Sequence, residues 1–211
     1  MQQATRIIAI RHGETDWNRA LRMQGHLDIA LNLRGLWQAQ ATARALAGED
    51  VAAVYSSDLQ RASATARAIA AACCAPLHLE EGLRERHLGS FQGWTFDEVQ
   101  AHHPDQALRW RQRDITFAPA GGETLVQISH RILTTAARLA ARHPGEQIVL
   151  VGHGGMLDML YRSAMRLDLQ TPRSWPLENA AINRLLHTAS GLTLTAWADT
   201  FHFDQIEDIP R

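Results

Sequence analysis

The segment 9-AIRHGETDWN-18 places an arginine and a histidine directly after a short apolar run. The run at 6–10 is predicted to form a buried strand. Charge beside a core costs free energy unless a partner offsets it, and a bound anion is the obvious partner. Arg11 and His12 therefore indicate an anion site at the mouth of this strand.

Cationic and proton-carrying groups also follow two other predicted strands. Arg61 lies about one turn into the helix after the strand at 51–56, and His153 follows the strand at 147–151 within 152-GHGG-155. Arginine forks and helix N-termini with glycine-exposed N–H groups suit a phosphate dianion. Ligands of open α/β sheets bind beyond the carboxyl ends of strands, so we expect these groups to converge on one phosphate.

A carboxyl group, Glu85, follows the predicted strand at 77–80 and is expected to reach the same pocket. A bound phosphate should favour its protonated form, which could then donate a proton. Taken singly, each residue has an ordinary explanation: a strand-end histidine is often hydrogen-bonded within the fold, and an isolated Arg61 or Glu85 is a solvated charge. Their placement at four strand ends favours phosphoryl transfer.

The elements that must position these groups alternate along the chain. Strands are predicted at 6–10, 51–56, 77–80, 147–151, 181–187 and 192–198, the last two joined as a hairpin by Ser190-Gly191. Helices are predicted at 33–48 after the N-cap Asn32, from 57 or 58 to 74, from the Thr95–Glu98 capping box to before Pro104, at 123–143, and after 152–155. This order predicts a mostly parallel sheet covered on both faces, with one antiparallel strand near an edge.

The composition is typical of one globular domain. The chain has 211 residues, of which 45% are hydrophobic and 20% charged, with a formal net charge of −1. Neither nucleic acid nor a membrane is therefore an expected partner, and with no recognisable leader a cytoplasmic protein is expected. The adjacent Cys73 and Cys74 have no metal-ligand spacing and are interpreted as small core residues.

Together these motifs resemble the histidine phosphatase superfamily, which includes the cofactor-dependent phosphoglycerate mutases. The resemblance covers nearly the whole of a single domain, 1–211, and rests on 10-IRHGETDWN-18, 22-RMQGHLDIALNLRG-35, 56-SSDLQRASATA-66, 83-LRERHLGSFQG-93, 121-GGET-124 and 151-VGHGG-155 in the family's order. It implies a three-layer α/β/α sandwich with a six-stranded, mostly parallel sheet and one antiparallel strand.

The resemblance also implies roles for individual residues. His12 would be the nucleophile that becomes phosphohistidine, and Glu85 the general acid and then the base for water. Other members of the implied site are Arg11, Arg61 and His153 as phosphate ligands, Asn18 and the Gly154 N–H as assisting groups, Gln24 and Gly25 as pocket positions, and Arg86 and His87 as mutase-like positions. A nucleophilic histidine needs a neutral nitrogen, so the other ring nitrogen of His12 should donate to a carbonyl. With two arginines supplying charge, no metal or other cofactor is expected.

Hydrolysis is favoured over mutase activity. The mutases that the chain resembles carry a longer insertion after the motif at 83–93, which supplies contacts to the substrate carboxylate and second phosphate, and 94–120 looks too short for it. We therefore expect a phosphatase of a small phosphomonoester, with a phosphoglycerate mutase as the alternative.

Two further segments carry weaker signals. The stretch 107-ALRWRQRD-114 is interpreted as a solvated helix face with its tryptophan packed inward, in preference to a second anion site built from Arg109, Arg111 and Arg113. Trp94 and His87 are expected to shape specificity instead. The segment 200–211 is a candidate for covering the pocket rim or for a homodimer contact.

Other protein classes fit the same residues less well. A serine hydrolase is disfavoured because no G-x-S-x-G occurs. A metal-dependent hydrolase could use a set of His12, Glu85, His87 and His153, but no paired helical histidines or Asp-rich motif support it. A phosphoester-binding module without catalysis is the main non-enzyme alternative, and such a module would be expected to lose His12 or Glu85.

Overall fold

The computed structural model describes residues 3–204, which build a six-stranded sheet. The strands lie in the order β3-β2-β4-β1-β5-β6. Their bounds are β1 Thr5–Arg11, β2 Ala53–Ser56, β3 Leu77–Leu79, β4 Gln147–Gly152, β5 Ile182–Thr188 and β6 Gly191–Asp199. Strands β1 to β4 pair in parallel, whereas β5 runs antiparallel to both β1 and β6. The predicted mostly parallel sheet and the terminal hairpin are confirmed.

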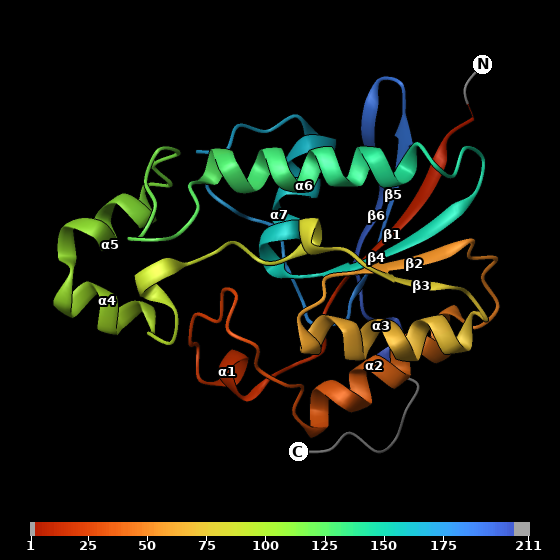
Figure 1. Ribbon diagram of the computed structural model, residues 1–211, viewed down its shortest axis with the longest axis horizontal. Helices are drawn as coiled ribbons and strands as arrows, with labels where there is room; N and C mark the ends of the chain where they lie inside the picture. The colour runs from red at the N-terminus through yellow and green to blue at the C-terminus, as the bar shows by residue number, and fades with distance from the viewer. Residues whose placement is uncertain (1–2, 205–211) are drawn as a thin grey trace.

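Helices cover both faces of this sheet (Figure 1). On one face lie α2 (Leu33–Leu46) and α3 (Gln60–Ala72), and on the other lie α6 (Leu125–Ala140) and α7 (Gly154–Met165). A small unit of α4 (Phe96–His102) and α5 (Pro104–Arg111) stands apart from both layers. The short helices are α1 Asp16–Arg19, α8 Phe201–Asp204 and the 3₁₀ turns η1 Glu81–Leu83 and η2 Gly89–Phe91. The expected three-layer sandwich is confirmed.

The two helical layers bury alternate residues of the central strands. Ile7 and Ala9 of β1 belong to the core cluster that includes α6 and α7, whereas Ile8 and Ile10 belong to the cluster that includes α2 and α3. Successive strand side chains point to opposite faces, so a strand covered on both sides must be apolar throughout. This is why the runs in β1 and β4 read as continuous apolar segments. Across residues 3–204, every helix is too short or too polar to span a bilayer.

The helix caps explain where the predicted boundaries hold and where they shift. The Asn32 side chain accepts from the Gly35 N–H, and the Thr95–Glu98 capping box opens α4, as predicted. α3 begins at Gln60 rather than at 57 or 58, because the Ser57 N–H still donates to the sheet. α6 is shorter than the predicted 123–143, because a capping box at Thr124 starts it later.

Parallel pairing brings three strand ends side by side. β4 lies between β1 and β2, with Arg11 paired to Gly152. The ladder continues past the strands, because the N–H of His12 donates to the Gly152 carbonyl and that of Ser57 to the Val151 carbonyl, each at 2.9 Å. His12, Ser57 and His153 therefore leave the sheet at one edge, which is where a ligand site is expected.

The predicted burial of both cysteines is wrong for one of them. α3 ends at Ala72, and Cys74 lies beyond it with a φ of 52°, exposed to solvent. Cys73 is partly buried against the α2–α3 side of the core. The alanine-rich pattern continued toward Pro76, but the chain turns out of the helix before it.

The described part of the C-terminal segment packs on α2. His202 Nε2 is 3.1 Å from the Thr42 hydroxyl, and the Phe203 and Trp37 rings lie 5.4 Å apart. The pocket-rim prediction therefore does not hold for residues 200–204, whose neighbours lie on α2. Residues 205–211 fall outside the described residues.

One tight contact holds the start of α2 against the loop that follows β1 and yields a stability prediction. A Cβ on Gly35 would overlap the Glu14 carbonyl oxygen, whereas a Cβ on Gly48 would meet nothing within 4 Å. Overpacking a close backbone contact costs roughly 1–3 kcal/mol. We expect Gly35→Ala to lower the free energy of unfolding in urea by about that amount, with Gly48→Ala, the matched control, within about 0.5 kcal/mol of wild type. Equal effects of the two substitutions would contradict this packing account.

Candidate active site

His12 and His153 form the buried centre of the site. The two imidazole rings lie 5.2 Å apart in an edge-on arrangement, and their side chains are 3% and 0% exposed. His153 Nε2 lies 2.9 Å from the Ser57 hydroxyl. His153 Nδ1 is buried with no partner within the described chain, so this nitrogen has hydrogen-bonding capacity to spare.

His12 carries its proton on a defined nitrogen. Nδ1 lies 2.7 Å from the Gly13 carbonyl oxygen, which only accepts, so Nδ1 donates and Nε2 keeps its lone pair. Burial, reinforced by the cations of Arg61 and Arg11, holds the pKa of His12 well below its ordinary value. The predicted carbonyl partner of His12 is confirmed, and the lowered pKa keeps the ring neutral at neutral pH.

Two arginines supply positive charge around these rings: Arg61, which is buried, and Arg11, which is half-buried at the cavity wall. Arg61 projects from α3, is 1% exposed, and donates to the carbonyls of Leu27 and Gly25 at 2.8 Å each. Burial lowers the pKa of Arg61 to about 10, with Glu85 and Asp28 acting in the opposite direction. Burial likewise lowers the pKa of Arg11. The Nε atoms of Arg11 and Arg61 are buried and find no acceptor within residues 3–204, which leaves both able to donate to an anion.

Glu85 meets Arg11 at the N-terminus of α7. Its carboxylate accepts from the Gly155 N–H, 3.1 Å from each oxygen, and from the Arg86 N–H at 2.7 Å. A Cβ placed on Gly154 would lie 3.7 Å from Arg11 Nε and 3.8 Å from Glu85 Oε2. These are ordinary van der Waals distances, whereas a Cβ on Gly155 would overlap Glu85 Oε1, so it is glycine at 155 that lets the carboxylate approach this backbone.

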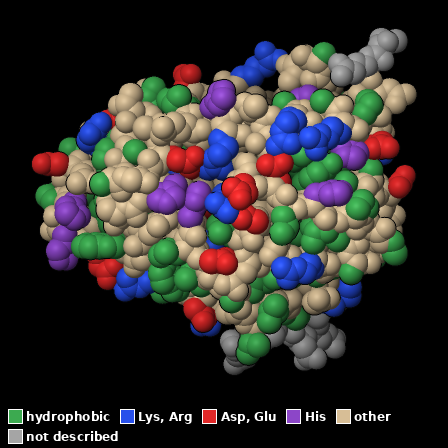
Figure 2. Space-filling view, viewed as in Figure 1, with side chains coloured by type: hydrophobic (Ala, Val, Ile, Leu, Met, Phe, Trp, Pro, Cys, Tyr) green, Lys and Arg blue, Asp and Glu red, His purple; other side chains and the backbone are tan. Residues whose placement is uncertain are grey.

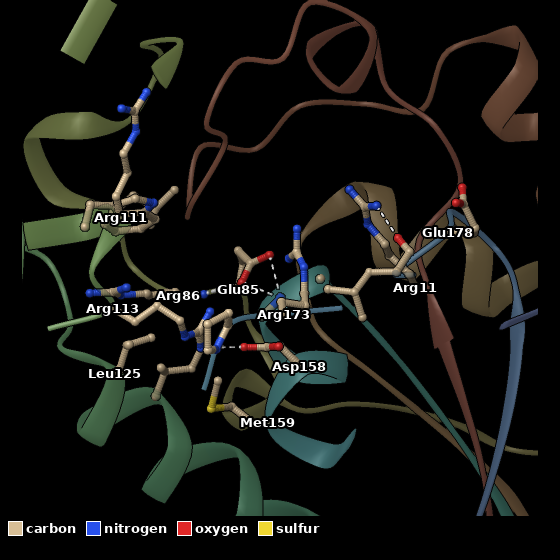
Figure 3. A pocket seen from close by; sticks show the side chains of 17 residues that line it. Arg11, Glu85, Arg86, Arg111, Arg113, Leu125, Asp158, Met159, Arg173 and Glu178 are labelled. Carbon is tan, nitrogen blue, oxygen red and sulfur yellow. Dashed lines mark hydrogen bonds and ion pairs between the residues drawn. The ribbon is translucent and has the colours of Figure 1, made fainter. Parts of the chain in front are cut away.

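A cavity of about 720 Å³ opens beside Arg11 and Glu85. Figure 3 shows Glu85 and Arg173 near its middle, with Arg86 and Arg113 on one side and Arg11 on the other. The lining residues are Arg11, Glu85, Arg86, Leu88, Trp110, Arg111, Arg113, Leu125, Ile128, Gly154, Gly155, Asp158, Met159, Pro172, Arg173, Leu177 and Glu178. His12, Arg61 and His153 are buried and are not among these lining residues. On the face drawn in Figure 2, acidic and basic side chains are interspersed.

The remaining predicted residues divide into one that lines the cavity and four that do not. Arg86 lines it: its guanidinium lies 4.4 Å from the centre of the Trp110 ring and donates to the carbonyls of Glu123 and Phe117. Burial lowers the pKa of Arg86 to about 10. The four that do not are Asn18, Gln24, Gly25 and His87.

Three of these four have a visible structural contact, and the fourth, Gln24, is buried. Asn18 forms a capping box with Thr15, and Gly25, with a φ of 53°, presents its carbonyl to Arg61. Gln24 is buried with Oε1 unpartnered within the described residues. The His87 ring packs 4.6 Å from that of His26. Gly25 therefore contributes through Arg61 rather than through the cavity wall.

The preferred interpretation of 107–114 is wrong in part. Trp110, Arg111 and Arg113 line the cavity, whereas Arg109 pairs with Asp114 at 2.8 Å on the surface. The α4–α5 unit has its own apolar cluster, which orients α5 toward the site, and a helical pattern alone does not encode that orientation. Trp94, expected to shape specificity, instead packs in this cluster.

Sequence reasoning missed the far wall of the cavity. Arg173, Leu177 and Glu178 come from the segment 166–180 between α7 and β5, which has no helix or strand and therefore no periodicity to read. Asp158 lies one helical turn after Gly154 and so faces the same way, which is a signal that could have identified it. Its carboxylate accepts from Arg113 at 2.9 Å and from Arg162 at 3.1 Å.

The alternative set of metal ligands is not assembled. Within residues 3–204, no three His, Cys, Asp or Glu side chains are grouped as metal ligands would be, so His12, Glu85, His87 and His153 form no such cluster.

Comparison with known proteins agrees with this geometry. The family model of the histidine phosphatase superfamily (branch 1) matches residues 7–200. A metal-independent phosphoserine phosphatase of Arabidopsis thaliana is 37% identical over 213 residues, covering 99% of this chain and 87% of that protein. Phosphoglycerate mutase-like protein 4 of Arabidopsis thaliana is 37% identical over 204 residues, covering 94% and 87%. The solved structure of a mycobacterial glucosyl-3-phosphoglycerate phosphatase matches with a TM-score of 0.83 at 33% identity, covering 94% of this chain and all of that chain (100%).

The buried histidines predict a pH-dependent stability. Burial, with the nearby Arg61, also holds the pKa of His153 well below its ordinary value, so the folded chain keeps this ring neutral while the unfolded chain protonates it below about pH 6.5. The stabilisation is therefore complete above that pH and is lost as the pH falls, by about 1.4 kcal/mol per pH unit for each such group. We plot the free energy of unfolding against pH between about pH 6.5 and 5. In this range His153→Gln should lower the slope by about 1.4 kcal/mol per pH unit, which is the contribution of one proton. The exposed His130→Gln is the control, and an unchanged slope in His153→Gln would contradict the assignment.

Proposed function

The chain belongs to branch 1 of the histidine phosphatase superfamily, and we propose that it removes phosphate from small phosphorylated metabolites through a phosphohistidine formed on His12. It is a phosphomonoesterase, in keeping with its phosphatase relatives. The observation that carries the proposal is the hydrogen bond from His12 Nδ1 to the Gly13 carbonyl, because it leaves Nε2 free to attack near the cations of the buried Arg61 and the half-buried Arg11.

The proposed reaction has two displacements. In the first, His12 Nε2 bonds to phosphorus while the bond from phosphorus to the leaving oxygen breaks, and Glu85 gives its proton to that oxygen. In the second, Glu85 takes a proton from water, the water oxygen bonds to phosphorus, and the bond to Nε2 breaks. Arg11, Arg61 and His153 would stabilise the charge on the phosphoryl oxygens in both steps, with Asn18 and the Gly154 N–H assisting.

The cavity supports a leaving group that carries its own negative charge. Arg173 lines it, is exposed, and forms no ion pair within residues 3–204. Leu125 and Leu177 supply apolar surface in the same cavity. Two of the relatives are named for phosphoserine and glucosyl-3-phosphoglycerate, and both of these esters carry a carboxylate. We therefore place the substrate among phosphorylated carboxylic acids.

The nucleophile and the absence of a metal requirement are tested together. We expect phosphate release from phosphoserine and p-nitrophenyl phosphate to persist in EDTA and to fall about 10³-fold or more in His12→Ala, because the covalent step is lost. His130→Ala, at an exposed position, is the control. Activity retained by His12→Ala would mean that the nucleophile is a different residue. Interconversion of phosphoglycerate isomers without phosphate release would instead identify a mutase.

The charged leaving group is tested at Arg173. A hydrogen bond between charged groups contributes roughly 1.5–3 kcal/mol, so Arg173→Gln should raise KM for phosphoserine by about tenfold or more. The same variant should leave KM for an uncharged alkyl phosphate within about twofold, because no partner is lost. A similar rise for both esters would show that Arg173 does not recognise the leaving group.

A further inference from the structure

Glu85 lies in a segment whose own secondary structure does not fix the position of its side chain. It follows the single 3₁₀ turn η1 and precedes η2, and residues 84–88 between them form neither helix nor strand. A general acid must be held within hydrogen-bonding reach of the leaving oxygen to act. The position of the Glu85 carboxyl group therefore depends on contacts from other elements.

Arg131 of α6 supplies the densest set of these contacts. Its Nη1 donates to the carbonyls of Gly82 (3.0 Å) and Arg84 (2.9 Å), and its Nη2 donates to the carbonyl of Glu85 itself (3.0 Å). One planar guanidinium thus spans the backbone from the 3₁₀ turn to the proposed acid. A lysine ammonium cannot reproduce this fork, because its donors radiate from a single atom.

A half-buried carboxylate holds Arg131 in this orientation. Glu123 Oε1 accepts from Arg131 Nε at 2.8 Å and Glu123 Oε2 accepts from Nη2 at 2.7 Å, a bidentate pair. Burial acts to raise the pKa of Glu123, but hydrogen bonds from Arg131 and from the His87 N–H outweigh it, so the pKa is lowered overall. Glu123 therefore stays ionised and orients the fork of Arg131.

The rest of α6 fixes the same segment from the same side. A Cβ on Gly82 would overlap the Thr135 hydroxyl, and Arg138 pairs with Glu80. One face of α6 carries Arg131, Thr135 and Arg138. The whole of the turn before Glu85 therefore packs against this face. Of the three, only Arg131 reaches the backbone of Glu85.

We propose that Arg131 is a positioning residue for Glu85, acting through its hydrogen bonds to the backbone of residues 82–85. Arg131 makes its five hydrogen bonds to Gly82, Arg84, Glu85 and Glu123, which leaves no guanidinium N–H for the substrate. The inference rests on the proposed role of Glu85 as the general acid. It adds that this role depends on a guanidinium of a different element.

The dependence on the leaving group distinguishes positioning from a general structural role. The value of kcat/KM depends on the steps up to departure of the leaving group. The nitrophenolate of p-nitrophenyl phosphate leaves with little protonation, whereas the serine alkoxide of phosphoserine needs a proton from the general acid. Misplacement of a catalytic group by about 1 Å can cost about 10²-fold. We expect Arg131→Lys to lower kcat/KM about 10- to 100-fold on phosphoserine and less than about threefold on p-nitrophenyl phosphate. The inhibition constant of inorganic phosphate should change by less than about twofold, since Arg11 and Arg61 are untouched.

Two controls make the outcome decisive. Arg138→Lys, on the same helix and also paired to the segment before Glu85, should leave both esters within about twofold of wild type. Glu85→Gln should show the same selective loss on phosphoserine as Arg131→Lys. If Arg131→Lys does not fold, Glu123→Gln should show the selective loss of kcat/KM on phosphoserine. This substitution removes the carboxylate that orients the Arg131 guanidinium but keeps Arg131 itself.

Each alternative result has one meaning. Equal losses on the two esters in Arg131→Lys, with a selective loss in Glu85→Gln, would overturn the positioning role and leave the proposed function intact. Equal losses on the two esters in Glu85→Gln would overturn Glu85 as the acid, and the Arg131 proposal with it.

Discussion

The parallel pairing of β1, β4 and β2 is the constraint on which the whole site depends. Because β4 lies between the other two strands, the backbones of His12 and Ser57 are both hydrogen-bonded to it, and His153 leaves the sheet between them. Residues that are distant along the chain therefore arrive at one edge without any loop having to bring them together. The arrangement of these residues is a consequence of strand order and register.

The groups at this edge can lie close together because the histidines are neutral and the arginine charges are partly offset. Two histidines are kept neutral by burial and by neighbouring arginines, while the Nε atoms of Arg11 and Arg61 are buried and still able to donate. Glu85 offsets part of that charge. A phosphoryl group would supply acceptors for these unpartnered arginine nitrogens. The unpartnered donors that make the empty site costly would therefore also bind the phosphate.

Much of the fold and of the chemical centre could be predicted, because local patterns carry them. Apolar runs, the Asn32 and Thr95 caps and the residue types at the strand ends gave the sheet and the groups around His12. The cavity wall could not be predicted in the same way. The orientation of α5 follows from tertiary packing, and Arg173 belongs to a segment without periodicity. Arg131 looks like an ordinary surface position of an amphipathic helix until the turn before Glu85 is placed against it.

The most direct measurement is to locate the phosphoryl group on the enzyme. Glu85→Gln mixed with p-nitrophenyl phosphate should still form the covalent intermediate, because that leaving group needs little protonation, but should hydrolyse it slowly for want of a base. After quenching in alkali, peptide mass spectrometry should find an acid-labile phosphoryl group on His12. Phosphate on any other residue, or sustained nitrophenol release with no protein-bound phosphate, would contradict the account.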